Sequence, residues 1–197
     1  MTLKERRKGR ANLRYWFSLS TPDERERGMR WYNEAREYAS MLSNLFNKDK
    51  VLCAGVISAL SPNNKWGRNK IDAFAVLKAV VDDTPSNKVK VCTYNANKEK
   101  AFAIARGEIA ILKRSPKTYA FALSIGGLDN DDVTIDKWHL RAVRTRSLSP
   151  RSCKTTITPK QYANLEADCQ KVAKELNIKP SELQAIVWVT IRNKWTA

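Results

Sequence analysis

Lys117 and Asp136 are the two residues whose types and spacing suggest chemistry. Each stands where a helix is expected to begin, and a Gly-rich turn at residues 126–132 separates the two helices. A lysine amine near the positive end of a helix can have a lowered pKa, which makes it a usable nucleophile. A carboxylate beside it can stabilise a developing cation or assist proton transfer. Both residues also have plainer interpretations: a solvent-facing lysine and an N-cap aspartate.

The surrounding sequence, residues 111–146, is ILKRSPKTYAFALSIGGLDNDDVTIDKWHLRAVRTR. Lys117 and Thr118 form a K-T pair, Val-Thr-Ile precedes Asp136, and Arg141 follows the aspartate by five residues. This order resembles the helix-hairpin-helix superfamily of DNA glycosylases that includes endonuclease III and oxoguanine glycosylase. There, a hairpin of the form L-P-G-V-G-x-K-T-A precedes a Gly/acid loop and V-D-x-H-x-x-R.

Further segments are similar to the same superfamily, namely residues 56–62, 94–101 and 184–193. The resemblance therefore covers about residues 50–195. Residues 31–35 and 59–62 are also similar to patterns in phage-encoded relatives.

The resemblance implies a DNA glycosylase with AP lyase activity, acting in base excision repair on double-stranded DNA. Such enzymes flip a damaged or modified nucleotide out of the duplex into a cleft between two helical lobes. By analogy, Lys117 attacks the anomeric carbon of the sugar, displaces the base and forms a Schiff base, after which β-elimination cuts the strand. Asp136 supports the positive charge and activates the amine. This chemistry requires no cofactor and no metal.

The chain departs from the family pattern in its hairpin. Lys113 and Ser115 replace the two hairpin glycines, and Pro116 lacks an amide donor. We therefore expect the side chains of Lys113 and Arg114 to contact phosphate. Leu60 stands where family members often have glutamine, a residue that fills the gap left by the flipped base. The four-cysteine iron–sulfur loop of endonuclease III is absent from this sequence.

Other residues are expected at the DNA on grounds of charge, polarity or the resemblance. The candidates for DNA contact are Lys113, Arg114, Ser115, Thr118, Lys137, Arg141, Asn63, Asn64 and Lys65. The candidates for the base pocket or a wedge are Leu60, Trp66, Trp138 and His139. Core packing is the alternative for both tryptophans. His139, three residues after Asp136, is interpreted as a packing or phosphate-contact residue rather than an acid–base partner.

Composition agrees with a nucleic-acid partner. The 197 residues carry a formal net charge of +16, which favours a polyanion, although a merely basic protein is the plain alternative. No stretch approaches the ~20 apolar residues of a membrane helix, and the N-terminus lacks the apolar stretch of a secretory signal. The four scattered cysteines predict reduced thiols rather than a metal centre. We expect a cytoplasmic, DNA-associated monomer.

The patterns predict an all-α protein. Helices are expected after a capping box at Thr21 and Glu24, and over 51–60, 65–81, 96–107, 109–112 and 116–125. Further helices are expected after Asp136, over 159–176 and over 181–195, the last with a capping box at Ser181 and Gln184. The segment 88–94 is a candidate strand. Two apolar stripes are predicted to be buried: Trp31, Ala35, Tyr38, Leu42 and Leu45, and Ile71, Phe74, Leu77 and Val81.

We expect two lobes, one of residues 49–130 and one of residues 1–48 plus 131–197. Two other functions stay open: a non-catalytic DNA-binding protein on the same fold, and a base-modifying transferase acting on hypermodified phage-type DNA. The first predicts salt-dependent DNA binding without strand cleavage. The second requires a small-molecule donor, and no Gly-rich phosphate loop for a nucleotide donor is present in the sequence.

Overall fold

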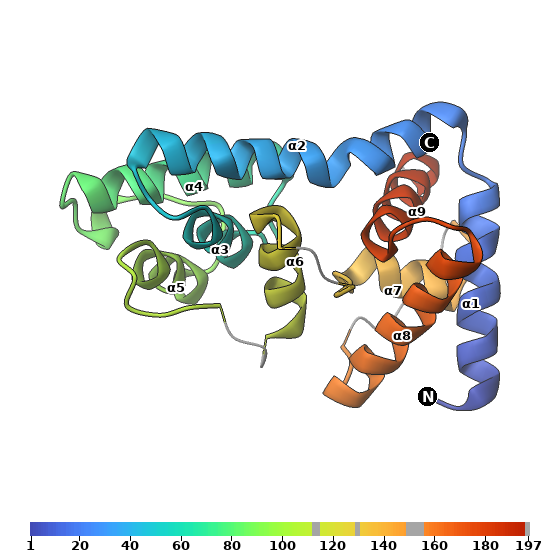
Figure 1. Ribbon diagram of the computed structural model, residues 1–197. Coiled ribbons are helices and arrows are strands. Elements are labelled where there is room, and N and C mark those ends of the chain that lie inside the picture. Colours follow the sequence, from blue (N-terminus) through green and yellow to red (C-terminus); the bar gives the residue numbers. More distant parts are fainter. Residues whose placement is uncertain (112–114, 129–130, 149–155, 196–197) are drawn as a thin grey trace. The chain divides into compact units, whose positions relative to one another are not determined.

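The computed structural model describes residues 1–111, 115–128, 131–148 and 156–195. All regular elements among these residues are helical (Figure 1), which confirms the predicted all-α class. The chain divides into unit 1, residues 1–33 and 131–197, and unit 2, residues 34–130. Unit 2 begins at Glu34, inside the long helix α2 (Pro22–Phe46), rather than at residue 49.

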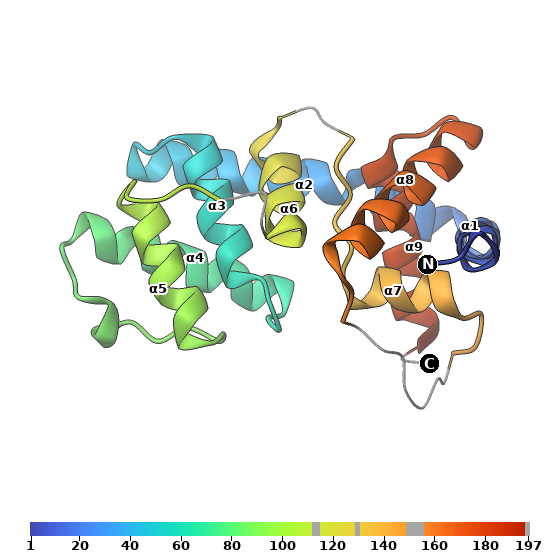
Figure 2. The same ribbon diagram turned by 90° about the horizontal axis from the view of Figure 1, so that it is seen from below.

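Unit 1 combines helices from both ends of the chain. They are α1 (Leu3–Ser18), the first part of α2, α7 (Lys137–Arg144), α8 (Pro159–Glu175) and α9 (Pro180–Trp195). Helix α1 packs against α7, α8 and α9, and α9 also packs against α7 and α8 (Figures 1 and 2). Residues that lie far apart in the sequence therefore share one core.

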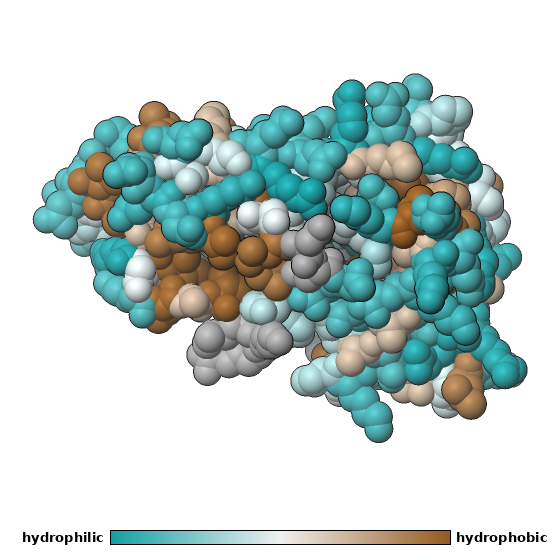
Figure 3. Space-filling model, viewed as in Figure 1, coloured by the Kyte–Doolittle hydropathy of each residue, from teal (hydrophilic) through white to brown (hydrophobic). Residues whose placement is uncertain are grey.

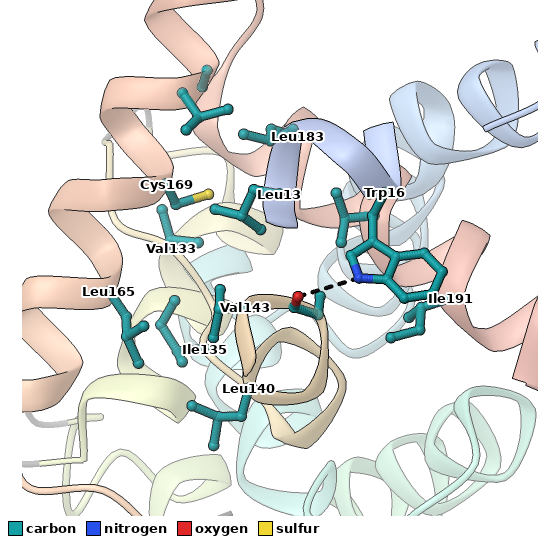
Figure 4. Close-up of a cluster of buried hydrophobic side chains, with 14 of the residues drawn as sticks. Leu13, Trp16, Val133, Ile135, Leu140, Val143, Leu165, Cys169, Leu183 and Ile191 are labelled. Carbon is teal, nitrogen blue, oxygen red and sulfur yellow. Dashed lines mark hydrogen bonds between the residues drawn. The ribbon is translucent and has the colours of Figure 1, made fainter. Parts of the chain in front are cut away.

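The core of unit 1 is built from side chains that point inward from α1, α7, α8, α9 and the segment before α7 (Figure 4). Leu13, Leu183 and Ile191 are completely buried in it. The indole of Trp16 is also buried, and its Nε1 donates a hydrogen bond of 3.2 Å to the carbonyl of Ala142. This bond satisfies the polar atom of a large apolar side chain and ties α1 to α7.

Unit 2 is organised around α3 (Lys50–Leu60). The helix packs against α4 (Trp66–Val81), α5 (Asn95–Ala105) and α6 (Pro116–Gly126), and every residue from Cys53 to Leu60 is buried. A helix that is apolar on all sides requires neighbours on all sides, and α4, α5 and α6 provide them. A short 3-10 turn, η1 (Ser86–Lys88), lies between α4 and α5.

Local capping signals decide several helix ends. The predicted capping box of α2 is confirmed, because Thr21 N–H donates to Glu24 and Glu24 N–H donates to the Thr21 hydroxyl. The predicted box of α9 is wrong. Glu182 accepts from the backbone of Lys179, so the helix begins at Pro180, and Gln184 instead accepts from the Tyr32 hydroxyl.

Three further predictions are corrected. Residues 88–94 form the end of η1 and an irregular segment rather than a strand, and they pair with no strand within the described chain. Residues 109–111 are not helical, because the preceding helix ends at Ala105 and Gly107 takes a left-handed φ of 77°. Leu45 is 58% exposed, although the α2 stripe predicts its burial.

The predicted stripe of α4 also fails. Leu77 is buried, but Ile71, Phe74 and Val81 are exposed. The buried face instead includes Asn69, whose Nδ2 donates to the carbonyl of Ile57, and Asp72, whose carboxylate accepts from neighbouring backbone and side-chain groups.

Candidate functional site

Lys117 lies in the first turn of α6 and is half-buried. Pro116 occupies the first helical position, where its missing N–H is not needed. Ser115 precedes the helix but makes no side-chain cap; its carbonyl accepts from Tyr119 N–H and from the Thr118 hydroxyl. Thr118 therefore bonds to the protein's own backbone.

Asp136 is the N-cap of α7. One carboxylate oxygen accepts hydrogen bonds from Trp138 N–H at 2.9 Å and His139 N–H at 2.8 Å. These bonds satisfy two of the free N–H groups in the first helical turn, and the negative charge complements the helix dipole. The predicted helix start at Asp136 is thus confirmed, and so is the plain structural role of this residue.

The extended segment before Asp136 is fixed by α8. Gln170 donates to the carbonyl of Asp131, Glu166 accepts from Val133 N–H, and Tyr162 bonds to both Val133 and Ile135. The three α8 residues are four apart, a rise of about 6 Å per step. Alternate residues of an extended chain are separated by a similar distance. Side chains on one face of α8 therefore form the hydrogen bonds with residues 131–135 that a neighbouring strand would otherwise form.

Glu166 is half-buried beneath this segment. Desolvation raises the pKa of its carboxyl, and the neighbouring charge of Asp132 adds to the effect, while the bond from Val133 N–H opposes it. Tyr162 is 6% exposed, and burial raises the pKa of its hydroxyl as well. Sequence reasoning missed Tyr162, Glu166 and Gln170, although their i, i+4, i+8 spacing marks one face of a predicted helix.

In unit 2, Asp72 fixes two loops. It is fully buried and accepts from Arg68 Nε at 2.8 Å, Asn64 Nδ2 at 2.9 Å and Cys92 N–H at 2.8 Å. Asn64 belongs to the loop after α3, and Cys92 to the loop before α5. One buried carboxylate therefore holds both loops with charge-assisted hydrogen bonds.

The two loops meet at their tips. Asn63, with a left-handed φ of 59°, donates from Nδ2 to the hydroxyl of Tyr94 at 2.9 Å, and the Thr93 hydroxyl donates to the carbonyl of Pro62. Tyr94 is 64% exposed. We call residues 61–66 and 92–94 the paired loops. They display an amide and an aromatic ring on a fixed backbone.

The other predicted residues of unit 2 have different environments. Leu60 is completely buried, so its side chain offers no surface to a ligand. Trp66 is half-buried, in edge contact with Tyr38 and Phe121. Lys65 is exposed. Lys113 and Arg114 lie outside the described residues.

The remaining candidates of unit 1 are on α7. Lys137 is exposed, whereas Trp138 and Arg141 are half-buried and stacked on each other. His139 is 1% exposed, and desolvation lowers the pKa of its imidazole to about 4. Within the described part of the chain neither ring nitrogen has a hydrogen-bond partner. His139 is therefore a neutral core residue at pH 7.

Lys117 belongs to unit 2 and Asp136 to unit 1. The contacts given above for each predicted catalytic residue are therefore contacts within its own unit. It brings together Asn63 with Tyr94 and Trp138 with Arg141, the first pair at the paired loops and the second on α7.

An apolar groove of about 380 Å³ lies in unit 2. Figure 3 shows apolar side chains gathered over α3, α5 and α6. The groove is lined mainly by Val51, Leu52, Gly55, Ile104, Ile109, Ile111 and Leu123. Neither Lys117 nor Asp136 lines it.

No cluster of three or more His, Cys, Asp or Glu side chains suited to a metal ion occurs among the described residues. None of the helices in the described ranges combines the length and apolar character that crossing a bilayer requires.

Comparison with known proteins gives one match. No curated protein and no solved structure matches the chain. A family model of unknown function, DUF7178, matches residues 2–195, which is nearly the whole length. The chain therefore belongs to the DUF7178 family.

Proposed function

We propose that this protein is a DNA glycosylase with AP lyase activity that acts on double-stranded DNA. Lys117 is assigned the role of nucleophile, and Asp136 that of the supporting carboxylate. The amine attacks C1′ of the target nucleotide, and the base leaves with the electrons of the glycosidic bond. Cleavage of the C1′–O4′ bond, with a proton going to O4′, opens the sugar ring and gives the Schiff base. The Schiff base acidifies the C2′ proton, and loss of that proton expels the 3′ phosphate.

The main support for this proposal is that hydrogen bonds fix the position of Asp136. The residue is fixed from one side by the first turn of α7 and from the other by the α8 side chains that bind residues 131–135. Catalytic carboxylates require this kind of preorganisation, because their benefit depends on a constant position relative to the developing charge. The net charge of +16 supports a nucleic-acid substrate.

The paired loops support the base-flipping step. Extruding a nucleotide leaves a gap in the duplex that a protein side chain must fill. Leu60 is buried, so we assign this role to Asn63 and Tyr94, whose hydrogen bond joins the two loop tips. A ring that is 64% exposed on a fixed backbone can stack on a base without ordering a flexible loop.

Borohydride trapping on a duplex with an abasic site tests the proposal. The wild type should form a covalent adduct, and Lys117→Gln should form none. Lys90→Gln is the matched control, since Lys90 is an exposed lysine of the same unit and should leave trapping unchanged. Absence of an adduct from folded wild-type protein would refute the lyase step.

The cap geometry of Asp136 favours a second candidate, a non-catalytic DNA-binding protein. Its hydrogen bonds to Trp138 and His139 give this carboxylate a structural role without chemistry. Under this alternative the wild type binds the abasic duplex with a steep salt dependence, forms no adduct and releases no base. Lys117→Gln and Asp136→Asn then leave this DNA binding intact.

A further inference from the structure

Two arginines and four tryptophans of unit 1 form a continuous series of ring and guanidinium contacts, which we call the Arg–Trp stack. Its members in order are Trp31, Trp188, Arg192, Trp138, Arg141 and Trp195. The Arg141 guanidinium lies 4.4 Å from the ring centre of Trp138 and 4.8 Å from that of Trp195. Arg192 lies 4.4 Å from the ring centre of Trp188 and 5.8 Å from that of Trp138.

Helical spacing explains how the stack forms. Trp138 and Arg141 are three residues apart on α7, while Trp188, Arg192 and Trp195 follow at steps of four and three on α9. Residues with these separations lie on one face of a helix. Because α7 and α9 pack against each other, the Trp138–Arg141 pair of α7 lies between Arg192 and Trp195 of α9 in the stack.

Arg141 differs from most other arginines of the described chain. The side chains that donate to a protein acceptor are those of Arg6, Arg10, Arg14, Arg25, Arg30, Arg36, Arg68 and Arg146. No acceptor for Arg141 exists among the described residues, and its Nε is buried between its neighbours without one. Two indole faces hold this cation, whereas carboxylate, carbonyl, amide or hydroxyl oxygens hold the others.

This environment suits binding of an external anion. The indoles fix the plane of the guanidinium, so little side-chain freedom is lost when a ligand binds. The terminal amino groups are not consumed by a protein carboxylate, and a planar guanidinium matches the paired oxygens of a phosphate. Exposed Lys137 and exposed Arg192 add positive charge to the same helices.

We infer that the Arg–Trp stack is a binding surface for the DNA backbone, with Arg141 contacting a phosphodiester. The inference rests on the proposed function, because it names the part of unit 1 that holds the DNA strand. The contact is made to phosphate, so it positions the strand without reading its sequence.

Duplex binding measured by fluorescence anisotropy over a series of salt concentrations tests the inference. Arg141→Gln should weaken binding to all duplex sequences alike and reduce the salt slope by about 1. Arg30→Gln is the control, because it removes the same charge from an arginine of unit 1 whose partner is Glu26. It should leave the slope nearly unchanged.

A second pair of variants separates geometry from charge. Arg141→Lys keeps the charge but loses the planar fork, so it should weaken binding with little change in slope. Arg30→Lys should bind as the wild type does. This pair also carries the test if Arg141→Gln does not fold.

The outcomes separate the inference from the proposed function. Binding of both Arg141 variants that equals binding of the Arg30 variants would overturn the role of the stack while leaving the DNA substrate intact. A wild-type protein that binds no duplex at low salt would instead overturn the proposed function and, with it, the inference.

Discussion

The hydroxyl of Tyr162 donates a 2.6 Å hydrogen bond to the carbonyl of Val133, within the segment that leads to Asp136. The same oxygen accepts from Ile135 N–H at 3.1 Å. One buried phenol thus satisfies two backbone groups that have no partner strand. These two hydrogen bonds tie the segment before Asp136 to α8, although α7 and the following loop separate Asp136 from α8 in the sequence.

Tyr162→Phe is therefore expected to lower the free energy of unfolding by about 1–3 kcal/mol. The change leaves the buried Val133 carbonyl and Ile135 N–H without their partner while preserving the ring. Urea denaturation provides the measurement. Tyr94→Phe is the control, because it removes a hydroxyl from a largely exposed side chain and should change stability by less than about 0.5 kcal/mol. Equal effects of the two changes would contradict this role of the Tyr162 hydroxyl.

Two substitutions at Asp136 separate capping from catalysis. Asp136→Asn retains a cap acceptor, so stability should be nearly unchanged while borohydride trapping is lost. Asp136→Ala removes the acceptors of Trp138 N–H and His139 N–H and should destabilise by about 1 kcal/mol. Thermal melts and trapping are measured on both variants. Full trapping by Asp136→Asn would show that the residue is only a cap.

Local signals in the sequence predicted much of the fold. The box at Thr21 and Glu24 located the start of α2, and Asp136 located the start of α7, because both depend on residues within one helical turn. The helix predicted over 181–195 is confirmed as α9, because its length exceeds that of a strand, although its start differs by one residue.

Two of the failures come from tertiary contacts, which local patterns do not reveal. The α4 stripe was assigned by apolar type, but Asp72 is buried because Arg68, Asn64 and Cys92 satisfy it. Likewise, nothing local to residues 131–135 identifies Tyr162 as their partner. Lys117 and Asp136 were therefore named from the sequence alone, whereas the side chains that hold the segment before Asp136 required the structure.

A substitution at Gly28 tests how closely α2 packs against α9 in unit 1. A Cβ at this position would lie 2.5 Å from Ile186 Cα and 2.7 Å from its backbone nitrogen. Gly28→Ala should therefore force α2 and α9 apart and destabilise the protein by about 1–3 kcal/mol or more. Gly67→Ala is the matched control on α4, where nothing lies within 4 Å. It should stabilise by about 0.5–1 kcal/mol, because alanine is the better helix former. Chemical denaturation measures both, and a tolerated Gly28→Ala would disprove the close approach.

The lowered pKa of His139 makes the free energy of unfolding depend on pH. Burial lowers the pKa of its imidazole from 6.5 to about 4, so the unfolded chain binds the proton more readily than the folded protein. The contribution of this group to stability is therefore complete above pH 6.5 and declines as the pH falls toward 4, by up to about 3 kcal/mol. Below pH 4 both states are protonated and the group has no further effect.

His139→Leu isolates this contribution from that of other titrating groups. Glu166 acts in the opposite direction, since its raised pKa reduces stability as the pH rises through its titration range. Because the His139 ring nitrogens have no partner among the described residues, an apolar side chain of similar size should change stability at pH 7 by less than about 1.5 kcal/mol. As the pH falls from 7 to 4, the urea midpoint of the wild type should decrease by more than that of His139→Leu. Parallel curves for the two proteins would show that His139 does not titrate in a buried site.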